Sequence, residues 1–310
     1  MNRLSTKHFI GLEHATTNDI ELIINTALTF REILDRPIKK VPSLKGVNIV
    51  NLFFENSTRT KLSFELAEKR LSADVLNFSA SSSSVNKGES LRDTVQNIQA
   101  MKIDCAVMRH PVPGSCKQLT QYLDCPIVNA GDGTHEHPTQ AMLDITSIYE
   151  KFGKIKDLKI VIVGDILHSR VAMSNIFGLR TMGAEIMLCG PSHLIPKYIS
   201  DFGIKISHNI DAALEWGDVI NILRIQKERM GIGLIPSIRE YRNLFGITKD
   251  RIKNLDKEIV IMHPGPINRG VEIDSYVADS DQSIILNQVL NGVAVRMGIL
   301  YLLLGVNDDE

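Results

Sequence analysis

Short apolar runs alternate with longer helical patterns along this chain, and the alternation occurs twice. In the first half the runs of strand length are 47–54, 74–78, 103–108 and 126–130. In the second half they are 158–164, 185–190, 218–223 and 258–262. Strands separated by helices pair in parallel, and helices cover both faces of the resulting sheet. The 310 residues therefore predict two parallel-sheet α/β domains.

The segments between the runs have helical periodicity. The helix that follows residues 47–54 is expected to turn four apolar side chains inward: Leu62, Leu66, Ala67 and Leu71. A long helix is predicted from Pro138 to Phe152, and a last one over 285–304. We expect the domain boundary inside the helix that starts at Pro138.

Charge and cysteine content limit the classes of protein to which this chain can belong. The 35 Lys and Arg residues nearly balance the 36 Asp and Glu residues, so there is no overall basic field for nucleic acid or membrane, and any anion site is local. The four cysteines show no CxxC spacing, which is typical of reduced thiols. The longest apolar run, "GVAVRMGILYLLLGV", contains Arg296 and is too short to span a bilayer, and "MNRLSTKHFIGLEH" lacks an export signal. We expect a soluble, cytoplasmic protein.

Polar residues collect where the predicted strands end. Parallel α/β sheets bind ligands at the carboxyl ends of their strands, and six such ends are followed by basic or polar groups. In chain order these are Ser57, Thr58, Arg59 and Thr60; Arg109 and His110; His137 and Gln140; His168 and Arg170; Arg224 and Gln226; and His263, Pro264, Gly265 and Pro266.

The stretch "FFENSTRTKLSFE" places three hydroxyls and a guanidinium at the start of a helix. A helix N-terminus has unpaired N–H groups and a partial positive charge. The Arg59 fork matches phosphate oxygens, and Ser57, Thr58 and Thr60 add short donors. These residues predict a phosphate-type anion site. The alternative is an ordinary Ser/Thr helix cap beside a solvated arginine.

The other motifs are weaker indications of function when each is taken alone. His137 before a helix is either a structural cap or a donor to an anion or carbonyl oxygen, and Pro138 suits the first helical turn. The serine-rich segment 79–90 is either a flexible linker or a lid that places Ser83 and Lys87 on an anion. The sequence "IVGD" lacks the GxGxxG pattern of a dinucleotide site. With no HExxH, Walker loop or carboxylate cluster either, we expect no cofactor and no metal.

Five motifs, in order, resemble a known family: "FFENSTRTKLSFE", "KGESLRDT", "VMRHP", "HPTQ" and "RIQKER". They are similar to the catalytic chain of aspartate carbamoyltransferase, over nearly the full length. The first and fourth motifs are shared with ornithine carbamoyltransferase. The ornithine enzymes have a Ser-Met-Gly loop and a His-Cys-Leu-Pro turn, and this chain has neither. Gly265 and the following "INRGVEI" depart from the family pattern. The contacts that this segment makes in the site are therefore left open.

The resemblance implies residue roles. Ser57, Thr58, Arg59 and Thr60 would hold the phosphate of carbamoyl phosphate. Thr60, Arg109 and His137 would polarise its carbonyl. Its amino end would meet Gln140 and the turn formed by Pro264, Gly265 and Pro266. Ser83 and Lys87 would come from a neighbouring subunit of a homotrimer. The carboxylates of L-aspartate would meet Arg170, Arg224, Gln226 and Lys87.

The implied activity is transfer of the carbamoyl group to the α-amino group of L-aspartate, giving N-carbamoyl-L-aspartate and phosphate, an early step of de novo pyrimidine biosynthesis. Residues 1–140 with the C-terminal helix 288–310 would form the carbamoyl-phosphate domain. Residues 141–287 would form a Rossmann-like aspartate domain, with the active site in the cleft between the two. Regulatory or other pyrimidine-pathway chains remain open as partners. The rival functions are transfer to ornithine or a related amine, and anion binding without catalysis.

Overall fold

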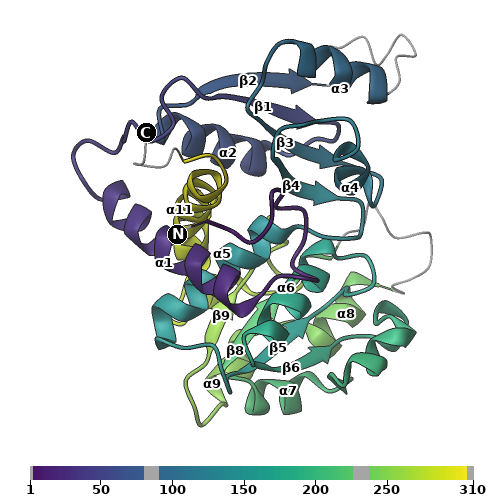
Figure 1. Cartoon of the computed structure of the whole chain (residues 1–310). Helices are drawn as coiled ribbons and strands as arrows, with labels where there is room; N and C mark the ends of the chain where they lie inside the picture. The colour runs from purple at the N-terminus through teal and green to yellow at the C-terminus, as the bar shows by residue number, and fades with distance from the viewer. Residues whose placement is uncertain (1–2, 80–90, 226–236, 306–310) are drawn as a thin grey trace. The chain divides into compact units, whose positions relative to one another are not determined.

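The computed structural model describes residues 3–79, 91–225 and 237–305, which form two compact units (Figure 1). Unit 1 comprises Met1–Thr146 and Leu290–Glu310, and unit 2 comprises Ser147–Val289. The chain passes between the units inside two helices, α5 (Pro138–Phe152) and α11 (Ile285–Leu304). Both helices have the bounds that the sequence predicts.

The sheet of unit 1 is entirely parallel and has the strand order β2-β1-β3-β4 (Figure 1). Its strands are β1 (Asn48–Phe53), β2 (Asp74–Ser79), β3 (Cys105–His110) and β4 (Ile127–Asp132). Consecutive residues of β1 from Ile49 to Phe53 are buried, so both faces of this strand are covered. The four strands that the sequence predicts in this half are thereby confirmed.

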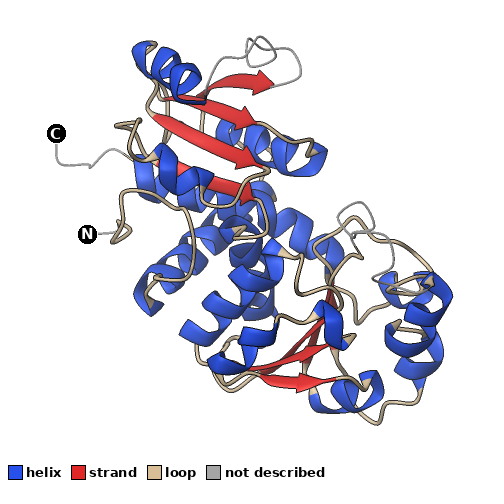
Figure 2. Ribbon diagram, turned by 90° about the vertical axis from the view of Figure 1, so that its right-hand side faces the viewer, coloured by secondary structure: helices blue, strands red, loops and turns tan. Residues whose placement is uncertain are grey.

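Helices lie on both sides of the sheet of unit 1 (Figure 2). They are α1 (Thr17–Leu34), α2 (Thr58–Arg70), α3 (Leu91–Ala100), α4 (Ser115–Leu119) and the unit's parts of α5 and α11. Val95 and Ile98 of α3 and Leu119 of α4 pack in one core cluster with Val50 and Leu52 of β1.

The inward face of α2 differs from the prediction. Ala67 and Leu71 are buried as expected, but Leu62 is 59% exposed and Leu66 is 41% exposed. The buried face instead contains Phe64 and Glu68, because Asn51 of β1 donates a hydrogen bond from Nδ2 to Oε2 of Glu68 at 2.8 Å. A hydrogen-bonded acid thus lies on the buried face of α2, on which the apolar pattern had predicted Leu62 and Leu66.

The sheet of unit 2 is also parallel, with the order β7-β6-β5-β8-β9. Its strands are β5 (Lys159–Val163), β6 (Glu185–Cys189), β7 (Lys205–Ser207), β8 (Val219–Ile222) and β9 (Val260–Met262). The predicted strands are confirmed. Sequence periodicity missed β7, because a three-residue edge strand with two exposed residues has no apolar pattern to detect.

The helices of unit 2 pack their apolar residues against this sheet. They are α6 (Arg170–Thr181), α7 (Ile210–Trp216), α8 (Ile238–Phe245), α9 (Lys249–Lys253), α10 (Ser275–Ala278) and the 3-10 turns η3 (Ser192–Leu194) and η4 (Lys197–Phe202). The core joins Val161 and Ile220 of the sheet to Leu214 of α7 and Phe245 of α8.

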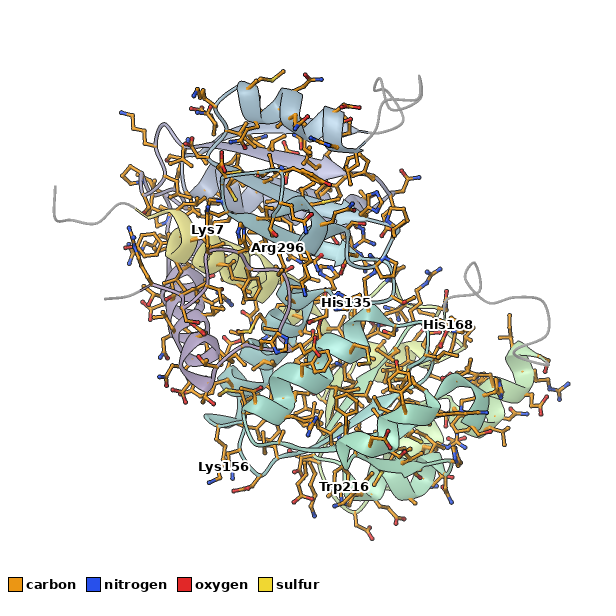
Figure 3. All side chains as sticks on the ribbon, turned by 45° about the vertical axis from the view of Figure 1, so that its right-hand side comes forward. Lys7, His135, Lys156, His168, Trp216 and Arg296 are labelled. Carbon is orange, nitrogen blue, oxygen red and sulfur yellow. The ribbon has the colours of Figure 1, made fainter. Side chains whose placement is uncertain are left out.

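Within the described residues, α11 alone is long and apolar enough to cross a membrane, yet 67% of its most apolar window is buried, as in the core helix of a globular protein. It begins at Ile285, before the apolar run singled out in the sequence, and it includes the buried Arg296 (Figure 3). All four cysteines are free and buried, as their spacing predicts.

Candidate active site

The parallel sheet of unit 1 grows in opposite directions from β1: β2 is added on one side and β3 on the other. The order β2-β1-β3-β4 places β2 on one side of β1 and β3 on the other, which makes this the switch point of the sheet. Ligands of open α/β sheets bind outside the carboxyl ends of the strands at such a point. Phe53, the last residue of β1, lies opposite Arg109 of β3 in the ladder. The structure therefore brings Arg109 beside the strand that leads into Ser57 and α2.

The N-terminus of α2 differs from that of five other helices, in which the N-cap side chain accepts a hydrogen bond. Ser57 occupies the N-cap position, but its side chain makes no capping hydrogen bond, and the first turn contains no acid. Thr58 and Arg59 are exposed, and Ser57 and Thr60 are half-buried. Five other N-cap side chains do accept a hydrogen bond from the first turn: Thr16, Ser169, Asn209, Ser237 and Thr248. The ordinary-cap interpretation thus lacks its defining bond, and the anion-site interpretation stays a prediction.

Arg109 is held in a fixed orientation at the end of β3. Its Nη2 lies 2.6 Å from Oε1 of Glu55, and its Nη1 donates to the carbonyl oxygen of Ala130 at 3.1 Å. Both charged side chains are mostly buried, so solvent screens the pair little. Glu55 was missed as a site residue, although it lies inside the first motif, because only strand pairing brings it to a residue so distant in sequence.

His137 and Gln140 lie where β4 leads into α5. His137 is buried, and its carbonyl oxygen accepts from the backbone N–H of Gln140 at 2.9 Å in the first helical turn. The Gln140 side chain donates from Nε2 to Oδ1 of the buried Asp144 at 3.0 Å. The helix start and a buried acid therefore hold this pair at the same sheet edge as Arg109.

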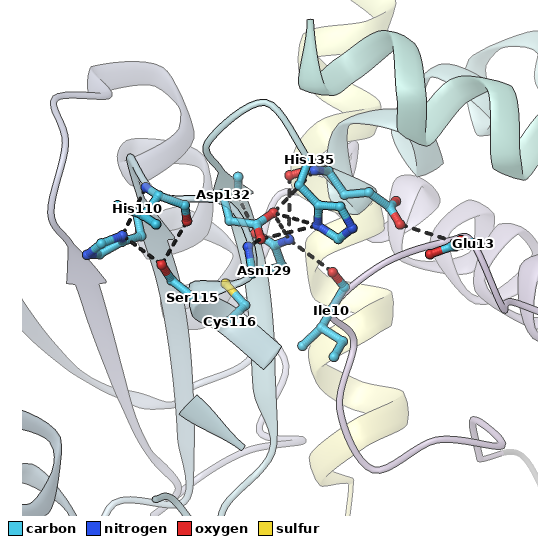
Figure 4. A network of polar contacts seen from close by, with 12 residues as sticks. Ile10, Glu13, His110, Ser115, Cys116, Asn129, Asp132 and His135 are labelled. Carbon is cyan, nitrogen blue, oxygen red and sulfur yellow. Dashed lines mark hydrogen bonds and ion pairs between the residues drawn. The ribbon is translucent and has the colours of Figure 1, made fainter. Parts of the chain in front are cut away.

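A polar network fixes the loops that follow β3 and β4 (Figure 4). Its centre is the buried Asp132, which accepts from Asn129 Nδ2 at 2.8 Å, from the backbone N–H of Gly114 at 2.8 Å and from that of Glu136 at 3.2 Å. His135 Nδ1 lies 3.2 Å from the same carboxylate. Burial disfavours the charge, but hydrogen bonds from His135, Asn129 and Gly114 outweigh it and hold the pKa of Asp132 below its usual value. Asp132 was also missed by sequence reasoning.

Unit 2 has its own switch point, between β5 and β8. Arg170, the first residue of α6, follows β5 and is buried, and Arg224 lies two residues beyond β8 and is half-buried. His168, labelled in Figure 3, has Nδ1 at 2.9 Å from Oδ1 of the buried Asp165, which holds the β5–α6 loop. Two guanidiniums thus follow the two strands that flank this switch point, and their role in binding a dicarboxylate stays a prediction.

The turn after β9 contains Pro264, Gly265 and Pro266. The Gly265 N–H donates to Nδ1 of the buried His263 at 2.7 Å, and Nε2 of His263 lies 3.3 Å from Oε1 of the buried Glu272. Gly265 has φ +65°, a left-handed conformation that favours glycine. A residue with a side chain at this position would be strained.

Three predicted site residues, Ser83, Lys87 and Gln226, lie outside the described residues. Within the part of the chain that is described, no group of three His, Cys, Asp or Glu side chains is arranged to hold a metal. A pocket of about 330 Å³ in unit 1 is lined by the N-terminal segment and residues such as Lys117 and His135, and it contains none of the predicted site residues. The candidate site is therefore defined by strand ends, not by this pocket.

Comparison with known proteins agrees with these arrangements. Residues 7–150 match the carbamoyl-phosphate-binding domain of the aspartate/ornithine carbamoyltransferase family, and residues 156–303 match its Asp/Orn-binding domain. The aspartate carbamoyltransferase catalytic subunit of Cytophaga hutchinsonii is 62% identical over 305 residues, covering 98% of this chain and 99% of that protein.

Solved structures give the same result. Aspartate transcarbamoylase from Trypanosoma cruzi in complex with carbamoyl phosphate is 30% identical with a TM-score of 0.88, and the match covers 97% of each chain. The catalytic subunit of M. jannaschii aspartate transcarbamoylase is 36% identical with a TM-score of 0.85, covering 98% of this chain and 100% of that one. The chain therefore belongs to the aspartate/ornithine carbamoyltransferase family.

Proposed function

We propose that this protein transfers the carbamoyl group of carbamoyl phosphate to the α-amino group of L-aspartate. The products are N-carbamoyl-L-aspartate and phosphate, an early step of de novo pyrimidine biosynthesis. The neutral amine attacks the carbonyl carbon, negative charge grows on the carbonyl oxygen, and the C–O bond to phosphate breaks. The departing phosphate takes the proton of the amine, so the reaction needs no separate general base.

Unit 1 would bind the donor. The phosphate would lie at the first turn of α2, where Ser57, Thr58, Arg59 and Thr60 supply hydroxyls, backbone N–H groups and a guanidinium. The absence of a Ser57 capping bond supports this assignment, because that hydroxyl is not engaged with its own helix. The donor is dianionic, so the local positive charge would neutralise the leaving group before the bond breaks.

The carbonyl oxygen would be polarised by Thr60, Arg109 and His137. Arg109 lies beside the end of β1 by strand register, and His137 follows the neighbouring β4 on the same sheet. Donors that are fixed before reaction need no reorganisation as charge develops. Gln140 and the Pro264–Pro266 turn stay predicted contacts of the amino end of the carbamoyl group.

Unit 2 would bind the acceptor. Arg170 and Arg224 are the guanidiniums at its switch point, and Gln226 and Lys87 are predicted to join them. Two cations suit the two carboxylates of aspartate and repel the second ammonium group of ornithine. The 62% identity to a protein named aspartate carbamoyltransferase favours the same choice.

One observation supports the assignment most. Each of the two sheets has arginine at the carboxyl ends of the strands that flank its switch point: Arg59 and Arg109 in unit 1, and Arg170 and Arg224 in unit 2. If the basic residues had no role in ligand binding, they would be expected to be scattered over solvated helix faces. One cationic edge for a phosphorylated donor and another for a diacid acceptor is what carbamoyl transfer to aspartate requires.

We also propose a cytoplasmic homotrimer in which Ser83 and Lys87 complete the site of a neighbouring copy. Leu62 and Leu66 form an exposed apolar strip on α2, and Leu76 on the edge strand β2 is 45% exposed. The helix α2 packs beside β2, which brings these exposed apolar residues to the same side of unit 1. An apolar strip beside a sheet edge fits contact with another copy.

The test is a colorimetric assay for carbamoyl amino acids with aspartate and ornithine as alternative acceptors. We expect carbamoyl aspartate from carbamoyl phosphate and aspartate, and no citrulline from ornithine. Product from ornithine alone would contradict the aspartate assignment. Phosphate binding with no product from either amine would favour the non-catalytic alternative.

A further inference from the structure

Arg296 is a buried cation that has no ion-pair partner among the residues that the structure describes. It lies on α11 in unit 1, is 3% exposed, and is labelled in Figure 3. Its Nη1 donates to Oγ of Ser63 at 2.8 Å and to the carbonyl oxygen of Gly292 at 2.9 Å. Among the described residues no carboxylate is within ion-pair distance of this guanidinium, and its Nε makes no hydrogen bond. Such burial is costly, so the charge calls for an explanation.

The surroundings favour a retained positive charge. The Cζ atom of Arg296 lies 4.9 Å from the ring centroid of Phe64, a cation–π contact. Burial and, to a smaller extent, the charge of Arg109 lower the pKa of Arg296 to about 10, and Asp144 opposes the decrease. The guanidinium is therefore protonated at neutral pH, and its field extends to Arg109.

Arg296 is joined to the helix that the donor phosphate would contact. Ser63 lies three residues after Thr60 on α2, so both side chains are on one side of that helix. Glu55 offsets much of the charge of Arg109, whereas Asp144, the acid that acts on Arg296, forms no ion pair with it in the described part of the chain. An excess positive charge thus lies one turn below the predicted phosphate site.

Gly292 makes room for this arrangement. A Cβ at position 292 would lie 2.8 Å from Nη1 of Arg296 and 3.1 Å from Cδ2 of Leu143. Any larger residue would force the guanidinium away from its present position. The glycine one turn earlier on α11 is therefore part of how the cation is held.

We propose that Arg296 is a positioning residue of the anion site, whose buried charge strengthens binding of the donor's phosphate at the first turn of α2. This inference rests on the proposed function, because it assumes that the donor phosphate binds there. Arg296 does not touch the phosphate. It acts through its field and through its hydrogen bond to Ser63, which supports the helix end.

The experiment compares inorganic phosphate binding by calorimetry in the wild type, Arg296→Met and Arg31→Met. Methionine fills much of the same volume without charge. Arg31 is a control for net charge, since it pairs with the exposed Asp35 at 2.6 Å on α1. We expect phosphate affinity to fall about tenfold or more in Arg296→Met and to stay within about twofold in Arg31→Met.

Thermal unfolding separates this role from a structural one. Replacing an unpaired buried ion with an apolar side chain is often neutral or stabilising, so we expect Tm of Arg296→Met to be unchanged or higher. Weaker phosphate binding at undiminished Tm supports the proposal. Phosphate affinity within about twofold of the wild type in the folded Arg296→Met variant would overturn it.

Two further variants keep the proposal testable if Arg296→Met does not fold. Gly292→Ala displaces the guanidinium without removing it, and we expect weaker phosphate binding and a higher KM for carbamoyl phosphate, with the KM for aspartate unchanged. Arg296→Lys retains a cation and should keep most of the wild-type affinity for phosphate. Unaltered phosphate binding in Gly292→Ala would contradict the inference. Product formation by the wild type is measured separately, so a failed transfer assay would contradict the proposed function alone.

Discussion

Nη2 of Arg109 lies 2.6 Å from Oε1 of Glu55, and both side chains are mostly buried. The two residues are brought together by the pairing of β1 with β3, where Phe53 lies opposite Arg109. The guanidinium assigned to the carbamoyl carbonyl is thus held on one side by a carboxylate and on the other by the carbonyl oxygen of Ala130. Its direction is set before any ligand arrives, which is the condition for electrostatic preorganisation.

The variant Glu55→Gln should distinguish the effect of the negative charge of Glu55 on phosphate binding from its effect on the orientation of Arg109. The amide removes a negative charge beside the anion site, so we expect inorganic phosphate to bind several-fold more tightly. The fork of Arg109 is held less firmly, so we expect kcat to fall about tenfold. Phosphate titration and steady-state kinetics measure the two effects. Weaker phosphate binding would argue that Glu55 supports the anion site.

Arg59→Ala and Arg109→Ala should each nearly abolish turnover. Losing one donor to developing charge typically raises the barrier by roughly 3–4 kcal/mol, which is a rate loss of about 10²–10³-fold. Carbamoyl aspartate formation at saturating substrates is the measurement. Arg36→Ala, at an exposed position in unit 1, is the matched control and should keep wild-type kcat. An Arg109→Ala variant with kcat close to wild type would remove Arg109 from the carbonyl site.

Arg224→Ala should chiefly weaken aspartate binding. The side chain follows β8 in unit 2, and one carboxylate of aspartate would lose its partner. We expect the KM for aspartate to rise at least about tenfold while the KM for carbamoyl phosphate is unchanged. Arg239→Ala, an exposed arginine on α8, is the control. Normal aspartate saturation in Arg224→Ala would overturn the assignment.

Mixing two inactive variants tests whether sites are shared between chains. In a trimer made from Lys87→Ala and Arg59→Ala chains, some sites combine an intact Arg59 with an intact Lys87 from the neighbour. Random assembly should restore roughly a quarter of wild-type activity, because one adjacent pair in four has that composition. A mixture of Arg59→Ala with Arg109→Ala should regain none, since both residues serve the same chain's site. No recovery after confirmed subunit exchange would argue for self-contained sites.

Glu68 should make stability depend on pH. Burial raises the pKa of this carboxyl from 4.5 to about 8, although the hydrogen bond from Asn51 opposes the shift. The folded chain therefore retains a proton that the unfolded chain loses, and stability from this group falls as pH rises from about 4.5 to about 8. Glu68→Gln should raise Tm by roughly 3–6 °C at pH 8.5 and change it little at pH 4.

A suitable control for that comparison lies on the same helix. Glu65 pairs with Lys69 at 2.6 Å, and its pKa is lowered by that hydrogen bond. Glu65→Gln should therefore raise Tm at neither pH. Thermal scans of both variants at the two pH values decide the matter, and an equal change for Glu68→Gln at pH 4 and pH 8.5 would exclude titration of Glu68 as the cause.

The sequence alone determined the two parallel sheets, apart from the short edge strand β7, and the polar residues that follow their strands. Buried parallel strands are continuous apolar runs, and the polar groups that end them are read directly from the chain. For the same reason α5 and α11 have their predicted bounds, since helical periodicity and Pro138 are local signals. The motif from Ser57 to Thr60 likewise depends on neighbours in sequence.

Only the tertiary structure decided which distant residues meet. Strand order placed Arg109 beside the end of β1 and paired it with Glu55, and it set the switch points where arginines collect. Packing turned Glu68 inward and Leu62 outward, and it joined Arg296 of the last helix to Ser63. Local periodicity predicts that one face of an element is apolar. The partner that covers this face and the charges that can be buried beneath it depend on contacts between segments far apart in the chain.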